Sequence, residues 1–169
     1  AFSFAKYSFA DEEIYSGGAP NAEAIGWKLG CQAYTFNRFT FFDAIDKVAK
    51  LGLRYIEAYP GQKLSPETGD VVFDHNLSPE LQQKVKEKLA QANIKLVNYG
   101  VVGLPNNEDE CRKVFEFAKS MGIETIVSEP PPDAISLVDK LANEYQIKVA
   151  IHNHPKPSRY WDYKKVLEV

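Results

Sequence analysis

The chain has 169 residues, of which 44% are hydrophobic and 25% charged, and its formal net charge is −3. This length and composition are typical of one globular domain. The charge balance leaves no basic block for nucleic acid, and no apolar run approaches the roughly 18 residues that a membrane-spanning helix requires. We therefore expect neither nucleic acid nor a membrane as partner, and a small molecule instead.

The N-terminal residues 1–26 follow neither the helical nor the strand period, and their aromatic content argues against simple disorder. We expect them to form an extension that packs on the rest of the domain or on a partner. The first residue is Ala1 rather than Met. The sequence therefore leaves open whether a signal peptide precedes it and in which compartment the protein acts.

From Trp27 onward, short apolar runs alternate with amphipathic segments. The runs are rich in β-branched residues and nearly continuously apolar, as expected of parallel strands buried on both faces. We predict strands over residues 28–36, 53–59, 94–100, 123–129 and 147–153.

Helices between these strands carry recognisable boundaries. Three residues are suitable N-caps: Thr40, Ser78 and Asn107. Three others suit the left-handed conformation just past a helix end: Gly52, Asn93 and Gly122. The second unit also holds an insertion, residues 60–76.

Strands that alternate with helices over short connections predict a parallel sheet, either an open doubly wound sheet or a (β/α) barrel. No G-x-G-x-x-G sequence follows a strand, which argues against the dinucleotide-binding form of the open sheet. The two cysteines, Cys31 and Cys111, are too few for a disulfide framework, and we expect both to be buried thiols.

Ligands bind at the carboxyl ends of the strands in either architecture. The last strand ends in His152 and His154, which alternation places on one face with Cα atoms about 6 to 7 Å apart. Both side chains can then reach one metal ion or one sugar, and Glu129 ends the neighbouring strand. The alternative is that one histidine is a hydrogen-bonded packing residue and the other a loop residue.

Other strand ends and loops supply further candidates. Glu57 can be a ligand or base, or an ion-pair partner of Arg54 or Lys28. His75 lies in the insertion, where we expect an exposed loop residue; the alternative is that the insertion covers a pocket. Three tyrosines can line a sugar site or pack at a barrel mouth: Tyr34, Tyr59 and Tyr99. The segment after the histidines either contacts an anionic or polyhydroxylated ligand or is an ordinary loop, and its candidates are Lys156, Arg159 and Trp161.

From about Trp27 to the C-terminus, the chain resembles the sugar phosphate isomerase/epimerase family, the xylose isomerase-like (β/α)8 or TIM barrels. The similarity is greatest to uncharacterised bacterial members, with some likeness to inosose dehydratases. The sequences that carry it are "LGLRYIEAYPGQKL", "KLVNYGVV", "GIETIVSEP" and "VAIHNHPKPSRYW".

This resemblance implies a divalent metal ion (Zn, Mn or Mg), held at the strand ends while a carboxylate or histidine moves a proton at a carbon next to a carbonyl. We expect Glu129 and His152 to be metal ligands, with His152, His154 and Glu57 as catalytic residues. The expected substrate contacts are Tyr34, Tyr99, Lys156, Arg159 and Trp161. His152 stands where many members have Glu, and the His-x-His sequence is similar to that of the inosose dehydratases.

A complete (β/α)8 barrel takes about 250 residues, and residues 27–169 supply only about five βα units. We therefore expect a truncated barrel, or half-barrels that complete each other in a homo-oligomer. A truncated barrel implies an incomplete metal site that can lack its ion.

Two function classes follow. The first is a metal-dependent isomerase or epimerase, or a dehydratase or lyase, that acts on a sugar or sugar derivative. The alternative is a non-catalytic carbohydrate-binding or scaffold protein with a degenerate barrel. Phosphodiester chemistry like that of endonuclease IV is disfavoured, since the chain has no basic stripe for a nucleic-acid backbone.

Overall fold

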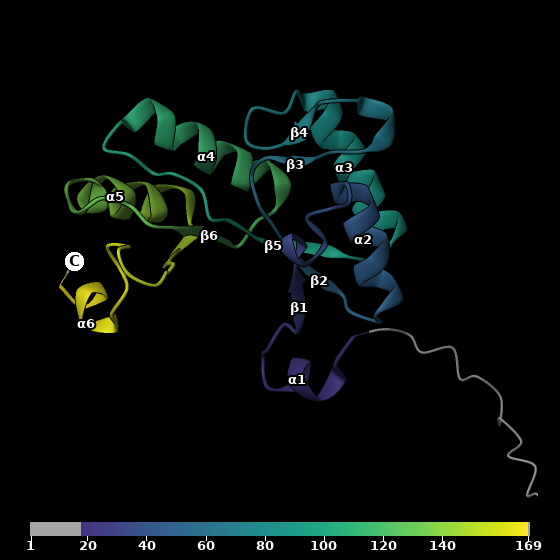
Figure 1. Ribbon diagram of the computed structural model, residues 1–169, viewed down its shortest axis with the longest axis horizontal. Helices are drawn as coiled ribbons and strands as arrows, with labels where there is room; N and C mark the ends of the chain where they lie inside the picture. The colour runs from purple at the N-terminus through teal and green to yellow at the C-terminus, as the bar shows by residue number, and fades with distance from the viewer. Residues whose placement is uncertain (1–17, 169) are drawn as a thin grey trace, which may run out of the picture.

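A parallel sheet forms the centre of the computed structural model, which describes residues 18–168. Its strands are β1 (Gly30–Gln32), β2 (Tyr55–Ala58), β5 (Lys95–Gly100), β6 (Thr125–Ser128) and β7 (Lys148–Ile151). Their spatial order is their order along the chain, and every neighbouring pair is parallel (Figure 1). A doubly wound sheet reverses its strand order at a switch point, whereas a barrel adds each strand beside the previous one. The fold is therefore α/β, with five consecutive units of a TIM-type (β/α) barrel.

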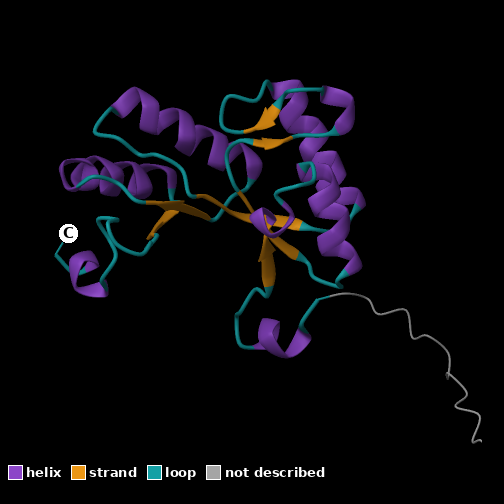
Figure 2. Ribbon diagram, viewed as in Figure 1, coloured by secondary structure: helices purple, strands orange, loops and turns teal. Residues whose placement is uncertain are grey.

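Four helices connect successive strands and lie in an arc around one side of the sheet (Figure 2). They are α2 (Phe41–Lys50), α3 (Pro79–Gln91), α4 (Glu108–Met121) and α5 (Ile135–Tyr145). Two short helices flank the sheet in sequence, α1 (Pro20–Ala24) and α6 (Tyr163–Val166). No helix among residues 18–168 is long and apolar enough to cross a membrane.

The insertion at residues 60–76 holds a small antiparallel pair, β3 (Gln62–Lys63) and β4 (Val72–Phe73). Three single-turn 3-10 helices complete the secondary structure of the described residues: η1 (Ala33–Phe36), η2 (Pro66–Thr68) and η3 (Pro132–Ala134).

The predicted helix boundaries are confirmed at six positions. The side chains of Thr40, Ser78 and Asn107 each accept a backbone hydrogen bond at the start of a helix. The residues after the helices have positive φ angles: Gly52 (74°), Asn93 (54°) and Gly122 (71°). The N-terminal extension predicted over 1–26 lies mostly outside the described residues, and within it residues 20–24 form α1.

The strands are shorter than predicted, and the first differs most. The prediction of a strand over 28–36 is wrong beyond Gln32, where the chain turns into η1. The Oε1 atom of Gln32 accepts a hydrogen bond from the backbone N–H of Tyr34 at 2.7 Å, and this bond turns the chain out of the strand. Tyr34 therefore lies in η1, past the carboxyl end of β1, rather than within a strand.

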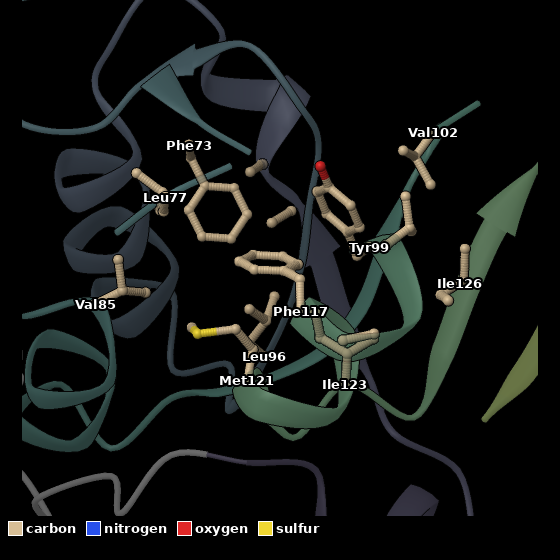
Figure 3. Packing of buried hydrophobic residues seen from close by; sticks show 14 of the residues in the cluster. Phe73, Leu77, Val85, Leu96, Tyr99, Val102, Phe117, Met121, Ile123 and Ile126 are labelled. Atoms are coloured by element: carbon tan, nitrogen blue, oxygen red, sulfur yellow. The ribbon is translucent and has the colours of Figure 1, made fainter. Parts of the chain in front are cut away.

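The helix-facing side of the sheet is the more apolar of the two. Ile56, Leu96 and Ile126 are buried there against the helices, together with aromatic residues of the core (Figure 3). On the opposite face, Glu57 and Asn98 are half-buried, so the expectation of strands buried on both faces is wrong for these positions. That face is the one available for a site.

The two cysteines differ. Cys111 is buried, as predicted, and its thiol donates to the carbonyl oxygen of Pro105 at 3.0 Å. Burial raises the pKa of the Cys111 thiol. Cys31 is only half-buried, so the prediction is wrong for this residue, which lies on a strand at the sheet edge.

Candidate active site

A cluster of amides and one carboxylate lies at the carboxyl ends of β1, β2 and β5. The strand register places Gln32 beside Glu57 and Glu57 beside Asn98. The Nε2 group of Gln32 donates to Glu57 Oε1 at 3.2 Å and to the carbonyl oxygen of Gly100 at 3.1 Å. The Nδ2 group of Asn98 donates to Glu57 Oε2 at 3.2 Å. Each carboxylate oxygen thus receives one amide hydrogen, and the orientation of Glu57 is fixed from both sides.

One of the proposed ion-pair partners of Glu57 is engaged elsewhere. Lys28 forms its salt bridge with Glu124, at the amino end of β6. The amide contacts, rather than a bond to Lys28, therefore hold the Glu57 carboxylate.

A second cluster lies at the ends of β6 and β7. The backbone N–H of His152 donates to Ser128 O at 2.9 Å and so extends the ladder one residue past β7. The rings of His152 and His154 lie with their centroids 4.4 Å apart. Nδ1 of His154 contacts Glu129 Oε1, and the Ser158 hydroxyl donates to Glu129 Oε2 at 2.8 Å.

Glu129 is suited to carry a negative charge. Burial alone would raise the pKa of its carboxyl group, but hydrogen bonds from His154 and Ser158 outweigh burial and hold the pKa below its ordinary value. The side chain is 22% exposed, so it stays reachable for a ligand.

These side chains form a candidate cation site of one carboxylate and two imidazoles. One ligand atom each of Glu129, His152 and His154 lies within 4.8 Å of the others. Three protein ligands of nitrogen and oxygen type are the set that catalytic zinc sites use, with a further position left for water or substrate. The residues present therefore fit a divalent metal ion.

Both clusters border one pocket of about 490 Å³. Tyr34 and Tyr59 form an aromatic wall, with ring centroids 5.1 Å apart in an edge-to-face arrangement. The Tyr34 side chain is largely exposed. The residues that line the pocket are Gln32, Tyr34, Glu57, Tyr59, Pro60, Gly100, Val101, His152 and His154.

Tyr99 is not in this pocket. It is fully buried on the helix side of the sheet, where its ring packs edge-on against those of Phe73 and Phe117 (Figure 3). The β5 register explains this, since Tyr99 is paired with Ala58 and Ile126, which face the helices. The prediction that Tyr99 contacts a substrate is therefore wrong.

The loop after the histidines lies near Glu129 but outside the pocket lining. Tyr160 is buried and donates its hydroxyl hydrogen to Pro130 O at 2.6 Å, which anchors the loop. The Lys156 ammonium lies 3.9 Å from the centroid of the Trp161 ring. Lys156, Arg159 and Trp161 are exposed, and their contact with a substrate stays a prediction.

His75 is half-buried rather than an exposed loop residue. Its Nδ1 atom lies 3.2 Å from the hydroxyl of Tyr99, on the helix side of the sheet. It thus contributes to packing of the insertion and is not part of the pocket.

A pH dependence of stability follows from His75. Burial lowers the pKa of His75 below its ordinary value of 6.5, so the folded protein keeps the imidazole neutral while the unfolded chain binds a proton. Stability is therefore expected to fall as the pH drops below about 6.5. The measurement is the urea concentration at the midpoint of unfolding, taken at a series of pH values from 7.5 down to 5.5. This midpoint should fall less steeply with decreasing pH in His75→Gln than in the wild type. Equal slopes in the two proteins would contradict this assignment.

Three residues of the site were not given a role from sequence. Gln32 and Asn98 hold Glu57, and Ser158 holds Glu129. Gln32 and Asn98 are polar positions at strand ends, so their sequence signal was present, but only the register shows that they meet Glu57. Ser158 had no such signal, because its place depends on the course of the loop.

Several solved structures are similar to the chain, and two of them are compared with it below. An uncharacterised protein from Parabacteroides distasonis has 31% sequence identity, with a TM-score of 0.71, over 76% of this chain and 54% of its own. D-psicose 3-epimerase, solved in the presence of D-fructose, has 15% identity and a TM-score of 0.54, over 78% of this chain and 55% of its own. The chain thus spans about half the length of each.

The likeness to D-psicose 3-epimerase is one of fold alone. Membership of the xylose isomerase-like family stays a prediction. No family model matches the chain, and no curated protein matches it. The more specific likeness to inosose dehydratases stays a prediction.

Proposed function

We propose that this protein is a metal-dependent isomerase or epimerase that moves a proton at a carbon next to a carbonyl in a sugar or sugar derivative. The observation that carries the proposal is that a candidate metal cluster and a separate, amide-held carboxylate border one pocket at the carboxyl ends of parallel strands. The similarity of fold to D-psicose 3-epimerase supports the same class of reaction.

In this proposal Glu129, His152 and His154 hold the metal ion. The bound ion supplies Lewis-acid polarisation of a substrate oxygen. His154 would complete the ligand set, because one of its ring nitrogens lies within 4.8 Å of the ligand atoms of Glu129 and His152.

Glu57 is the residue that we assign to proton transfer. Among the described residues that line the pocket, it is the only carboxylate. Gln32 and Asn98 restrict its rotation, so the carboxylate is oriented before the substrate arrives. A positioned general base contributes about 10² to 10⁴ in rate.

The aromatic wall of Tyr34 and Tyr59 suits the apolar C–H face of a sugar ring. Both tyrosines line the pocket, and Tyr34 has the exposed ring of the pair. We therefore assign these two side chains to substrate placement.

The test is a turnover screen with the metal-loaded full-length protein and a panel of aldoses and ketoses. We expect at least one sugar to be converted to an epimer or isomer, and we expect conversion to stop on addition of EDTA and in Glu57→Gln. Glu87→Gln, on the exposed surface of α3, is the matched control and should keep full activity.

Other outcomes of the screen would replace the proposal. Loss of water from the sugar, without a change of stereochemistry, would favour a dehydratase or lyase. Saturable sugar binding without turnover, unchanged by EDTA, would favour the non-catalytic carbohydrate-binding or scaffold function.

A further inference from the structure

We propose that Gln32 is a positioning residue that fixes the aromatic wall and the Glu57 carboxylate relative to each other. The inference rests on the proposed function for the role of Glu57, and it adds that one side-chain amide sets two parts of the pocket together.

The side chain of Gln32 bonds to three separate segments of the chain. Its Oε1 atom accepts a hydrogen bond from the backbone N–H of Tyr34 in η1 at 2.7 Å. Its Nε2 group donates to Glu57 Oε1 on β2 at 3.2 Å and to Gly100 O on β5 at 3.1 Å. Gln32 and its three partners all line the same pocket. One amide therefore joins three walls of that pocket.

Only one orientation of this amide satisfies its neighbours. A glutamine amide has an acceptor oxygen and a nitrogen with two donor hydrogens, and both hydrogens are used here. Rotation by 180° would place the oxygen against the carboxylate of Glu57 and the carbonyl of Gly100, which are also acceptors. The nitrogen would then face the Tyr34 N–H, which is a donor. The bond from Tyr34 thus determines which end of the amide faces Glu57.

Asn98, the other amide at Glu57, lacks this link. Among the described residues its side chain makes one hydrogen bond, from Nδ2 to Glu57 Oε2 at 3.2 Å, and it does not line the pocket. Asn98 can restrict the carboxylate but has no bond to η1.

The aromatic wall depends on η1 through Tyr34. The N–H groups in the first turn of a helix have no partner within the helix, and Gln32 supplies the partner for that of Tyr34. The Tyr34 ring packs edge-on against Tyr59. Gln32 therefore sets where the Tyr34 ring stands as well as how Glu57 is turned.

Two substitutions separate the two halves of this link. Gln32→Glu keeps an acceptor for the Tyr34 N–H but has no hydrogen to donate to Glu57 or Gly100. Gln32→Met has similar length and provides neither. The matched controls are Gln91→Glu and Gln91→Met, at the exposed last residue of α3.

The first measurement needs no activity. Backbone hydrogen exchange of the intact protein is followed by NMR at the Tyr34 N–H. Exchange should be about fivefold or more faster in Gln32→Met than in the wild type, because one hydrogen bond is lost, and it should stay near the wild-type rate in Gln32→Glu and in both controls. Equal exchange in Gln32→Met and the wild type would overturn the inference.

The second measurement is the rate at which the zinc-loaded protein exchanges solvent deuterium into D-ketohexoses at the carbon next to the carbonyl. Gln32→Glu should lower kcat about 100-fold, the usual cost of a misplaced catalytic group, with little change in KM because the aromatic wall keeps its place. A role of Gln32 in shaping η1 alone would leave kcat unchanged. Full kcat in Gln32→Glu would therefore overturn the inference.

The two proposals fail in different ways. Turnover by the wild type with unchanged Tyr34 exchange in Gln32→Met would leave the proposed function standing and overturn the positioning role. Absence of turnover in the wild type would overturn the proposed function. Hydrogen exchange at Tyr34 in Gln32→Met, and in Glu57→Leu, which removes one acceptor of the amide, would then decide whether Gln32 links the two walls: faster exchange in both supports the link, and an unchanged rate in either contradicts it.

Discussion

Glu129→Gln and His152→Ala are each expected to lower the affinity of the protein for Zn²⁺ by at least about 100-fold, because changes to residues that merely support metal ligands already cost 10- to 100-fold. Each variant removes one of the three donors that lie within 4.8 Å of each other. In the wild type, zinc at about 100 times its dissociation constant should add about 2.7 kcal/mol to the free energy of unfolding. Thermal melts with and without zinc measure this, and the variants should lose the zinc-dependent increase.

The controls separate loss of ligands from loss of fold. Without zinc, both variants should melt cooperatively, since neither Glu129 nor the two histidines belong to the buried core. Glu87→Gln on α3 should retain the full zinc-dependent increase. A zinc effect that persists unchanged in Glu129→Gln and in His152→Ala would place the metal elsewhere and contradict the assigned ligand set.

Gly100→Ala is expected to lower the free energy of unfolding by about 3 kcal/mol, at the upper end of the usual cost of overpacking. A Cβ atom at Gly100 would lie 2.7 Å from Val127 Cβ and 2.8 Å from Val127 C, and closer still to the Val127 carbonyl oxygen. Gly100 and Val127 are register partners in β5 and β6, so backbone must move to admit the methyl group. For a chain of this size, the melting temperature should fall by roughly 6 to 12 °C.

Gly103→Ala is the matched control, because a Cβ atom there would meet nothing within 4 Å. It should change the melting temperature little. Since Gly100 O accepts a hydrogen bond from Gln32, Gly100→Ala should also weaken sugar binding through Glu57. Equal melting temperatures for the two variants would contradict the close contact between β5 and β6.

Much of the fold could be predicted because its signals are local. The caps Thr40, Ser78 and Asn107 and the alternation of apolar runs with helices depend on neighbours in sequence. The choice between barrel and doubly wound sheet could not be made this way, since strand order depends on which strands pair across distant parts of the chain.

The site was predictable in its residue types but not in its contacts. Alternation correctly placed His152 and His154 together, and the structure adds the contact of His154 with Glu129. Tyr99 was misplaced because a strand-end tyrosine can face either side, and only the register shows that it faces the helices. The amide bonds to Glu57 likewise depend on the pairing of three strands.

The most direct test of the central claim is solvent deuterium exchange. The zinc-loaded protein is incubated in D₂O with each ketohexose, and proton NMR follows the hydrogen on the carbon next to the carbonyl. We predict exchange into at least one sugar, blocked by EDTA and in Glu57→Gln but retained in Glu87→Gln. Saturable binding of a sugar with no exchange at that carbon would contradict the assignment of the pocket to proton transfer.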